Sequence, residues 1–533
     1  MIASSHHRSS PDAGRDTRAL GEKLSWLTLV ALALWGSAPI VYLLVRAASL
    51  HESLTGGESL FAADQLQYMA WIRSAGEHGL IADGFDLRSG GHVFLHPMFV
   101  LSGLLWRIGL PIALSFLLWM PVAVVVLFIG FRQYTRRLLH APLARASALI
   151  LALFFVTPAD PLVGWTVGSN GLGTLAGELN PSGSLYGYFP IAVTTGLMPL
   201  VMLGLGRIID PARPRSARSP VAYIVATALL GLLVAWLHPW QGPIVLLIIA
   251  GVLVKARFRR SHWTLLVPAV ATAIPLAYYF ALSKIDSAWK TAQLQNPPTR
   301  PNVLLLCLAL APLVGFAAVA IRGRRWESDD LILGLWPLAA LAVYFLSPEY
   351  APHALEGISL PLAVLAIQGW QRLHWPGWVA AAAVAVATLP GLIFNLQLSR
   401  DVALIDPQGL LIRPDERRAL GYLDRAPNAG GVLPSLRISA AVPAYTGRRT
   451  WLGHAVWTPD YAARARVATE LFSGRLTGNA ARALLQSVGA RYILADCEPG
   501  FVPTWLGSLL VAEHRFGCVR VYELAVGSNS AQL

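Results

Sequence analysis

The sequence is poor in charged residues. Asp, Glu, Lys and Arg make up only 13% of its 533 residues, whereas soluble domains carry about 25%. Hydrophobic residues make up 55%, and apolar runs of about 20 residues, the length that crosses a bilayer, recur from Leu24 to Leu398. The chain is therefore an α-helical polytopic membrane protein. Its net charge of +13 does not indicate nucleic-acid binding, because the basic residues stand mostly in short clusters between the apolar runs.

Cysteine and several catalytic motifs are also scarce or missing. Three cysteines exclude a disulfide-rich scaffold and a metal site built from thiolates. The sequence lacks the Gly-rich strand-to-helix fingerprint of nucleotide-binding folds, the HExxH pattern and the GxSxG nucleophile elbow. Enzymes that depend on those motifs are therefore excluded.

The charges of the loops predict how the chain crosses the membrane. Residues 1–23 are basic and polar, so we expect a disordered cytoplasmic tail, and the run 24–48 is too long for a cleaved signal sequence. The arginine clusters fall on one face if the chain crosses about eleven times. We assign 93–109 to the outer face as a re-entrant or juxtamembrane piece; if it also crosses, the count becomes about thirteen. Either odd count leaves the carboxy terminus outside.

The composition changes at Arg400. Charged residues, Gly and Pro become frequent, and four short strand-like runs and two helices that end at Gly predict an α/β domain. Cys497 and Cys518 end and begin neighbouring strands, so an oxidising compartment permits a disulfide; two free buried thiols are the alternative. The predicted parts are the tail (1–23), a transmembrane domain (24–399) whose first outer loop is 50–92, and an extracytoplasmic domain (400–533).

One long polar stretch, residues 58–97, follows the first apolar run. So much polar chain at one membrane face indicates binding or chemistry there. Asp64 stands at the start of a helix in a capping pattern with Gln67, so it is either a helix cap or a functional carboxylate. On that helix Asp64 shares one side with Tyr68 and Trp71. A carboxylate beside aromatic surface suits a sugar hydroxyl whose proton must be accepted.

This stretch resembles the first outer loop of GT-C glycosyltransferases, most of all the protein O-mannosyltransferase and aminoarabinose transferase branch. The resemblance rests on Asp64-Gln65, Tyr68, Ile72-Arg73, and His96-Pro97 before an apolar run. It implies a GT-C-like fold and inverting transfer of a sugar from a polyprenyl-phosphate donor to an acceptor hydroxyl on a glycan, lipid or protein. It also implies that Asp64 is the catalytic base. Two departures stand out: Gln65 replaces the Glu of that branch, and His96 replaces its Lys.

Further polar residues of the outer loops complete the set of candidates. The residues expected to bind substrate are Gln65, Tyr68, His96, His238, Gln241, His353 and Glu356. His353 resembles a basic residue that precedes a late span in GT-C enzymes and contacts the lipid phosphate. No cofactor is certain; a divalent cation would find its ligands among Asp83, Asp86 and Glu178, since hard cations prefer clustered carboxylates. A solvated turn is the alternative for the two aspartates.

A last segment, residues 446–461, is dense in polar and aromatic side chains. It either binds a glycan through Arg448, Arg449, His454, Trp451 and Trp457 or packs at the membrane interface.

Three hypotheses follow. The leading one is a glycosyltransferase of the plasma (inner) membrane, with its amino terminus cytoplasmic and its carboxy-terminal domain extracytoplasmic. Its partners would be the polyprenyl-phosphate-linked sugar, the acceptor and the lipid bilayer, with no nucleic acid. The second is a transporter or flippase of a lipid-linked saccharide, which the absence of two similar halves disfavours. The third is a non-catalytic protein of cell-envelope glycan assembly.

Overall fold

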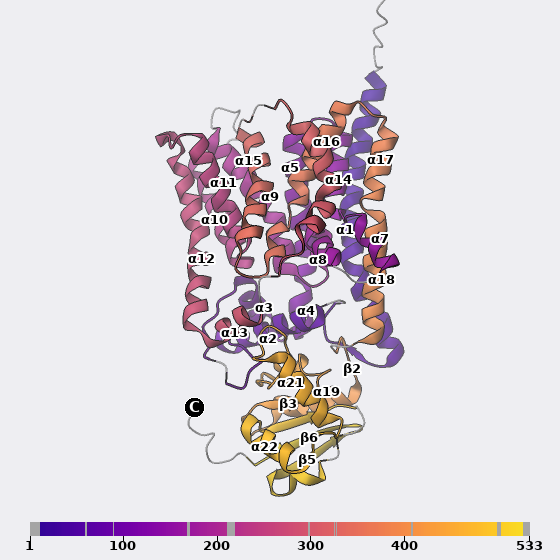
Figure 1. The fold of residues 1–533 in the computed structure, drawn as a ribbon, viewed down its shortest axis with the longest axis vertical. Coiled ribbons are helices and arrows are strands. Elements are labelled where there is room, and N and C mark those ends of the chain that lie inside the picture. The colour runs from indigo at the N-terminus through magenta and orange to yellow at the C-terminus, as the bar shows by residue number, and fades with distance from the viewer. Residues whose placement is uncertain are drawn as a thin grey trace, which may run out of the picture. The chain divides into compact units, whose positions relative to one another are not determined.

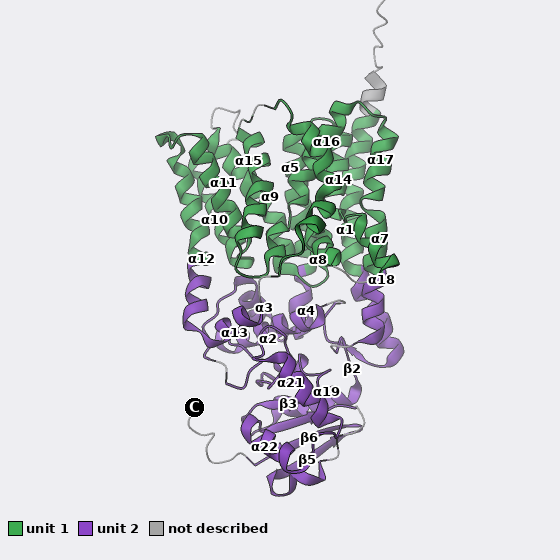
Figure 2. Ribbon diagram, in the orientation of Figure 1, with its two compact units in different colours: residues 1–37, 120–276, 298–396 green, residues 38–119, 277–297, 397–533 purple. Residues whose placement is uncertain are grey.

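The structure is a computed structural model of the chain. It describes residues 11–58, 61–88, 90–167, 171–210, 219–296, 299–324, 326, 328–406, 409–497, 501 and 503–525, with side chains from residue 16 onward. By compactness the chain divides into two units, coloured in Figure 2. Unit 1 comprises Met1–Ser37, Met120–Leu276 and Pro298–Leu396, and unit 2 comprises Ala38–Trp119, Ala277–Pro297 and Gln397–Leu533. The first outer loop and the carboxy-terminal region thus fall in one unit, unlike the division that we predicted at 399/400.

Unit 1 is a bundle of helices that run side by side (Figure 1). Its helices are α1 (Pro11–Leu50), α5 (Trp119–Leu138), α6 (Pro142–Phe154), α7 (Ala159–Thr166), α8 (Gly171–Leu179), η2 (Pro181–Leu185), α9 (Phe189–Ile209), α10 (Pro220–Leu237), α11 (Gln241–Lys255), η3 (Arg260–Leu265), α12 (Leu266–Ile285), α14 (Val303–Ile321), α15 (Ser328–Leu346), η4 (Ala351–Leu355), α16 (Ser359–Leu373), α17 (Gly377–Val386) and α18 (Leu389–Ile405). Of these, α1, α12 and α18 continue into unit 2.

Nine helical segments among the described residues are long and apolar enough to cross a membrane. They are Asp16–Leu50, Ile112–Leu138, Pro142–Thr166, Phe189–Ile209, Pro220–Leu237, Arg260–Ile285, Val303–Ile321, Ser328–Leu346 and Gly377–Ile405. Two more expected crossings, α11 and α16, are helices of 15 residues, about 22 Å against a hydrocarbon core of about 30 Å. The polytopic helical fold is confirmed, and the count of about eleven crossings stays a prediction.

At the amino-terminal end one detail differs from expectation and a second agrees with it. Helix α1 begins at Pro11, so residues 11–23 are helical and not part of a disordered tail; residues 1–10 lie outside the described part of the chain. The segment 93–109 contains α3 (Pro97–Arg107), whose 11 residues give about 17 Å of helix, too short to cross a bilayer.

Unit 2 joins the first outer loop to the carboxy-terminal region. Its elements are β1 (Ser53–Leu54), α2 (Ala62–His78), α3, α4 (Ile112–Leu117), α13 (Ser287–Gln295), β2 (Leu411–Ile412), α19 (Pro414–Arg425), β3 (Val432–Pro434), α20 (Ala441–Thr446), α21 (Tyr461–Phe472), α22 (Gly478–Val488), β4 (Tyr492–Ala495), η5 (Thr504–Leu509), β5 (Leu510–Phe516) and β6 (Val519–Leu524). Strand β1 pairs antiparallel with β2, which ties the loop after α1 to the chain after α18.

The carboxy-terminal region folds around one four-stranded sheet in the order β3-β4-β6-β5. Strand β3 is parallel to β4, and the other two pairs are antiparallel. Helices α21 and α22 bury Ala468, Leu471, Ala481 and Leu485 in the same core as Ile493 of β4. The four strands and two helices expected from the sequence are therefore present (Figure 1). A disulfide joins Cys497 to Cys518, while Cys307 of α14 is a free, exposed thiol.

Candidate functional site

Asp64 lies in the first turn of α2 and is held by a residue far along the chain. The N-cap of α2 is Phe61, so Asp64 is not the cap that its spacing suggested. Instead, Asp64 Oδ1 accepts a hydrogen bond of 2.8 Å from His454 Nε2. The Asp64 side chain is 35% exposed, whereas that of His454 is only 4% exposed. A buried imidazole thus orients a carboxylate that solvent reaches.

The hydrogen bonds assign the protonation state of His454. Its Nδ1 accepts the backbone N–H of Val456 at 3.1 Å, so Nδ1 carries no proton. The proton therefore sits on Nε2 and points to Asp64, and the imidazole is neutral. This tautomer makes His454 a donor to the carboxylate and leaves Asp64 as the proton acceptor of the pair.

The backbone around His454 is fixed by the first outer loop. Thr458 Oγ1 accepts the N–H of His454 at 3.3 Å and donates to the carbonyl of Phe85 at 3.1 Å. The backbone at Gly453 also lies close to Phe85 of that loop. A Cβ on Gly453 would lie 2.7 Å from the Phe85 ring. Only glycine fits there without a shift, so the Phe85 loop and the His454 segment must fit together for the Asp64 contact to form.

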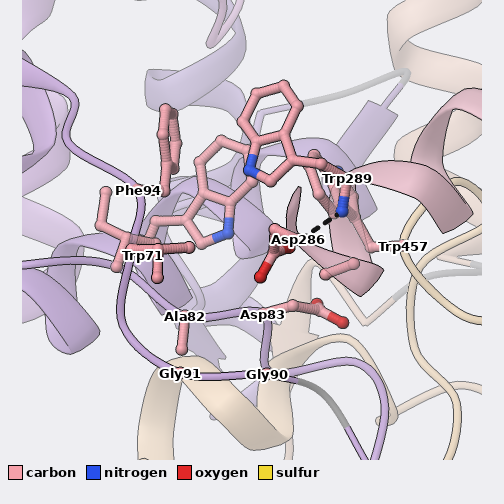
Figure 3. A pocket seen from close by; sticks show the side chains of 12 residues that line it. Trp71, Ala82, Asp83, Gly90, Gly91, Phe94, Asp286, Trp289 and Trp457 are labelled. Carbon is pink, nitrogen blue, oxygen red and sulfur yellow. Dashed lines mark hydrogen bonds between the residues drawn. The ribbon is translucent and has the colours of Figure 1, made fainter. Parts of the chain in front are cut away.

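Beside these residues unit 2 contains a small aromatic cavity of about 10 Å³, room for one water-sized group (Figure 3). The Trp457 ring lies 5.1 Å from that of Trp71 and 5.3 Å from that of Trp289, in both cases edge to face. Phe94 makes the same kind of contact with Trp71 and Trp289. Trp71 and Asp64 both lie on α2, and Trp457 lies three residues after His454 in the sequence. The cavity and the Asp64–His454 pair are therefore built from the same two segments.

Two carboxyl groups also line this cavity, on the side where Figure 3 shows Gly90 and Gly91. Asp286 caps α13 by accepting the backbone N–H of Trp289 at 3.1 Å. Asp83 Oδ1 accepts the N–H of Phe85 at 2.9 Å. Burial nevertheless raises the pKa of Asp83 to about 8, so at neutral pH this group is mostly a neutral acid.

The aspartates of the first outer loop have separate partners, and the predicted cation ligands Asp83 and Asp86 stay a prediction. Asp86 pairs instead with Arg464 at 3.0 Å, Asp64 pairs with His454, and Asp83 is held by backbone. Within the described residues, none of these three belongs to a group of His, Cys, Asp and Glu side chains close enough to share one ion.

Three other residues of the loop that we expected to bind substrate are engaged in packing. Gln65 is fully buried and donates from Nε2 to the carbonyl of Glu58 at 2.9 Å while its Oε1 accepts the Glu58 N–H. His96 is buried and stacks on Phe99 at 4.2 Å, and Tyr68 stacks on the same ring at 5.2 Å. These contacts make Gln65 and His96 supports of the loop, because neither presents a polar atom at an open surface. Tyr68 is half-buried, and its role stays a prediction.

Unit 1 gathers the other predicted residues into a second group. His238 follows the last residue of α10, Gln241 opens α11, and His353 and Glu356 lie in and after η4. His238 Nε2 lies 2.8 Å from Glu356 Oε2, and His353 Nδ1 lies 2.9 Å from Glu356 Oε1. Glu178 of α8, expected only as a weak metal ligand, joins them at 3.1 Å from His353 Nδ1.

The charges of this group disfavour a bare phosphate. Burial alone lowers the pKa of His353, but the carboxylates of Glu178 and Glu356 outweigh it and raise that pKa to about 10. Burial raises the pKa of Glu178 to about 7, against the pull of His353. The positive charge of His353 is thus matched by carboxylates within 3.1 Å, so the residue that we expected to hold the donor phosphate has no surplus charge for it.

The fold of this chain is similar to the folds of solved membrane proteins of the expected GT-C class. The structure is similar to the apo oligosaccharyltransferase of Archaeoglobus fulgidus, with a TM-score of 0.50 and 13% identity over 89% of this chain and 70% of that one. The structure of ArnT from Cupriavidus metallidurans bound to undecaprenyl phosphate is also similar, with a TM-score of 0.49 and 13% identity. That match covers 92% of this chain and 99% of the ArnT chain. No family model and no curated protein matches the sequence. The expected GT-C resemblance is confirmed at the level of the fold.

Proposed function

We propose that this chain is an inverting glycosyltransferase that moves a sugar from a polyprenyl-phosphate donor to an acceptor hydroxyl, with Asp64 as the base. The observation that carries the proposal is the Asp64–His454 contact. It supplies a carboxylate that is accessible, oriented from behind by a buried neutral imidazole, and set in the polar loop of a GT-C-like fold. The solved structures similar to this chain include one bound to undecaprenyl phosphate, which supports the choice of donor.

The chemistry needs one proton acceptor. The acceptor hydroxyl lies against the Asp64 carboxylate, which takes its proton as the oxygen attacks the anomeric carbon of the sugar. The new C–O bond forms on the face opposite the phosphate, and the bond between the anomeric carbon and the phosphate oxygen breaks. The phosphate leaves attached to its lipid, and the anomeric configuration inverts. No nucleotide takes part, in agreement with the absence of a nucleotide-binding fingerprint.

His454 is a positioning residue in this scheme. Its Nε2–H fixes Oδ1 of Asp64, Val456 N–H holds the imidazole at Nδ1, and Thr458 Oγ1 holds the backbone N–H of His454. Holding a carboxylate in one orientation lowers the entropic cost of bringing it to the acceptor hydroxyl. The aromatic cavity beside it is too small for a sugar; the buried rings of Trp71 and Trp457 pack against each other and hold α2 and the His454 segment together.

The proposed location is the outer face of the plasma (inner) membrane. Positive loops on one side favour a cytoplasmic amino terminus. The disulfide between Cys497 and Cys518 supports an extracytoplasmic position for the carboxy-terminal domain, because disulfides persist in oxidising compartments. The lipid-linked donor would therefore be used in the outer leaflet.

The test compares Asp64→Asn with wild type in membranes supplied with a polyprenyl-phosphate sugar labelled in the sugar. Loss of the base should lower transfer by about 10²- to 10⁴-fold. Asp401→Asn is the matched control, because Asp401 is an exposed residue of the same unit at the end of α18. Wild-type transfer by Asp64→Asn would remove Asp64 as the base. Movement of the intact lipid-linked sugar across the bilayer with no transfer product would favour a flippase.

A further inference from the structure

Three side chains of unit 1 converge at one point. His238 stands in the turn between α10 and α11, and His353 and Glu356 lie on the η4 segment. One ligand atom from each of these three residues lies within 4.8 Å of the other two. Glu178 of α8 lies beside them, with Oε2 3.1 Å from His353 Nδ1.

Two atoms of this group lack hydrogen-bond partners. His238 and Glu356 are each 5% exposed, and neither His238 Nε2 nor Glu356 Oε2 makes a hydrogen bond to any described residue. They lie 2.8 Å apart, but their orientation is not that of a hydrogen bond. Buried polar atoms without a partner are costly and call for an explanation such as an ion.

We propose that this group is a binding site for a divalent cation of the zinc type, with His238 Nε2, His353 Nδ1 and a Glu356 oxygen as its three protein ligands. An ion placed among them gives both unsatisfied atoms a bond. Zinc bonds of about 2.0–2.1 Å in a tetrahedron separate ligand atoms by about 3.4 Å. The three ligand atoms lie within 4.8 Å of one another, so side-chain shifts bring them to one ion and leave its fourth position open.

The ligand types select the metal. Two imidazoles with one carboxylate suit Zn²⁺ and related transition metals, whereas Ca²⁺ and Mg²⁺ prefer oxygen ligands alone. The Glu356 carboxylate also offsets one of the two charges of the ion. His353 Nδ1 must lose its proton to become a ligand, so binding releases a proton.

A supporting shell holds the ligands in place. Gln241 Nε2 donates to the carbonyls of His353 and Glu356 at 3.2 and 3.4 Å. The Trp240 ring lies 4.8 Å from the His353 ring and 5.2 Å from that of His238. Such contacts orient metal ligands in known sites, and their loss costs about 10- to 100-fold in affinity.

The site goes beyond the proposed transfer reaction and does not contain Asp64. A cation there would join the α10–α11 turn and the η4 segment, two parts of unit 1 that are distant in sequence. Its binding is measured without any transfer assay, so failure of this proposal is distinguishable from failure of the proposed function.

The experiment strips the purified full-length protein of metal with a chelator and titrates it with Zn²⁺, then with Co²⁺ to record the visible spectrum. The expected result is one tight ion per chain and the absorption of four-coordinate cobalt. His238→Ala and Glu356→Gln should lose the ion, and Gln241→Ala should weaken it about 10- to 100-fold.

His140→Ala is the control, because His140 is an exposed histidine of the same unit. It should bind the ion as wild type does, and so should Asp64→Asn. Failure of the wild-type protein to bind either metal would overturn the proposal. Equal binding by wild type, His238→Ala and Glu356→Gln would do the same, even if one variant is poorly folded, because the surviving ion would then sit elsewhere.

Discussion

Replacement of His454 separates the positioning of Asp64 from its chemistry. In His454→Leu the shape of the side chain is roughly kept, but the Nε2–H that reaches Asp64 Oδ1 at 2.8 Å is lost. In His454→Gln an amide N–H can take its place. We therefore expect His454→Leu to slow transfer strongly and His454→Gln to recover much of the rate.

The magnitude follows from the contact. A hydrogen bond to a charged group contributes about 1.5–3 kcal/mol, which corresponds to about 10- to 150-fold in rate if the contact is needed in the transition state. His454 is almost fully buried, so solvent does not weaken this contact. The loss should appear in kcat with little change in KM for the donor, because the contact orients the base and does not bind the lipid.

The assay is transfer of labelled sugar by purified protein at saturating donor, with thermal unfolding measured on the same samples. His454→Gln must show a smaller loss than His454→Leu at matched stability. The reasoning is refuted if His454→Leu retains wild-type kcat. It is also refuted if the two variants lose activity in step with their stability, since His454 would then only hold the fold.

Three further predictions concern unit 2. Because burial raises the pKa of Asp83 to about 8 from an unfolded value near 4, its contribution to stability is complete below about pH 4 and is lost as pH rises to about 8. Asp83→Asn should therefore raise Tm relative to wild type by an amount that grows across that range, and a difference independent of pH would contradict this. Replacing Cys497 and Cys518 by Ser opens a loop with a separation of 21 residues and should cost the carboxy-terminal domain about 3 kcal/mol in denaturant unfolding. Gly453→Ala forces a Cβ to within 2.7 Å of the Phe85 ring and should cost about 1–3 kcal/mol as well as transfer activity; unchanged stability would mean that the loop yields easily.

The local patterns of the sequence were sufficient for most elements. The four strands of the carboxy-terminal sheet and the helices α21 and α22 lie where alternation and terminal glycines placed them. Apolar runs located the long helices, because the thickness of the hydrocarbon core sets the number of consecutive apolar residues that a crossing helix needs. The pairing of Cys497 with Cys518 was left open, since spacing does not fix the distance between two strands.

The sequence predicted the position of the candidate base but not the contacts of the charged residues around it. Asp64 could be singled out because it sits in a polar loop beside aromatic residues. His454 was a candidate only as a glycan-binding residue of the segment 446–461. Its pairing with Asp64 spans 390 positions, and no local sequence pattern indicates it. Asp83 and Asp86 looked like a pair of ligands, yet Asp86 is bound by Arg464 and Asp83 by backbone. Partners of charged groups are chosen by tertiary packing, which spacing along the chain does not report.

Gln65 and His96 show that a motif position does not reveal whether a side chain is exposed. Both occupy motif positions of the resembling family, and both are buried here by contacts within the loop, with Glu58 and Phe99. A polar residue near a motif is as well suited to fixing backbone as to binding substrate, and only burial distinguishes the two uses.

The central claim is that Asp64 drives direct attack of an acceptor hydroxyl on a lipid-phosphate sugar. The most direct measurement is the anomeric configuration of the product that the purified protein forms from a donor of known configuration, determined by NMR. The account predicts the inverted configuration in every product linkage, and none of it formed above background by Asp64→Asn. A product that retains the donor configuration would contradict the account, as would transfer by Asp64→Asn at the wild-type rate.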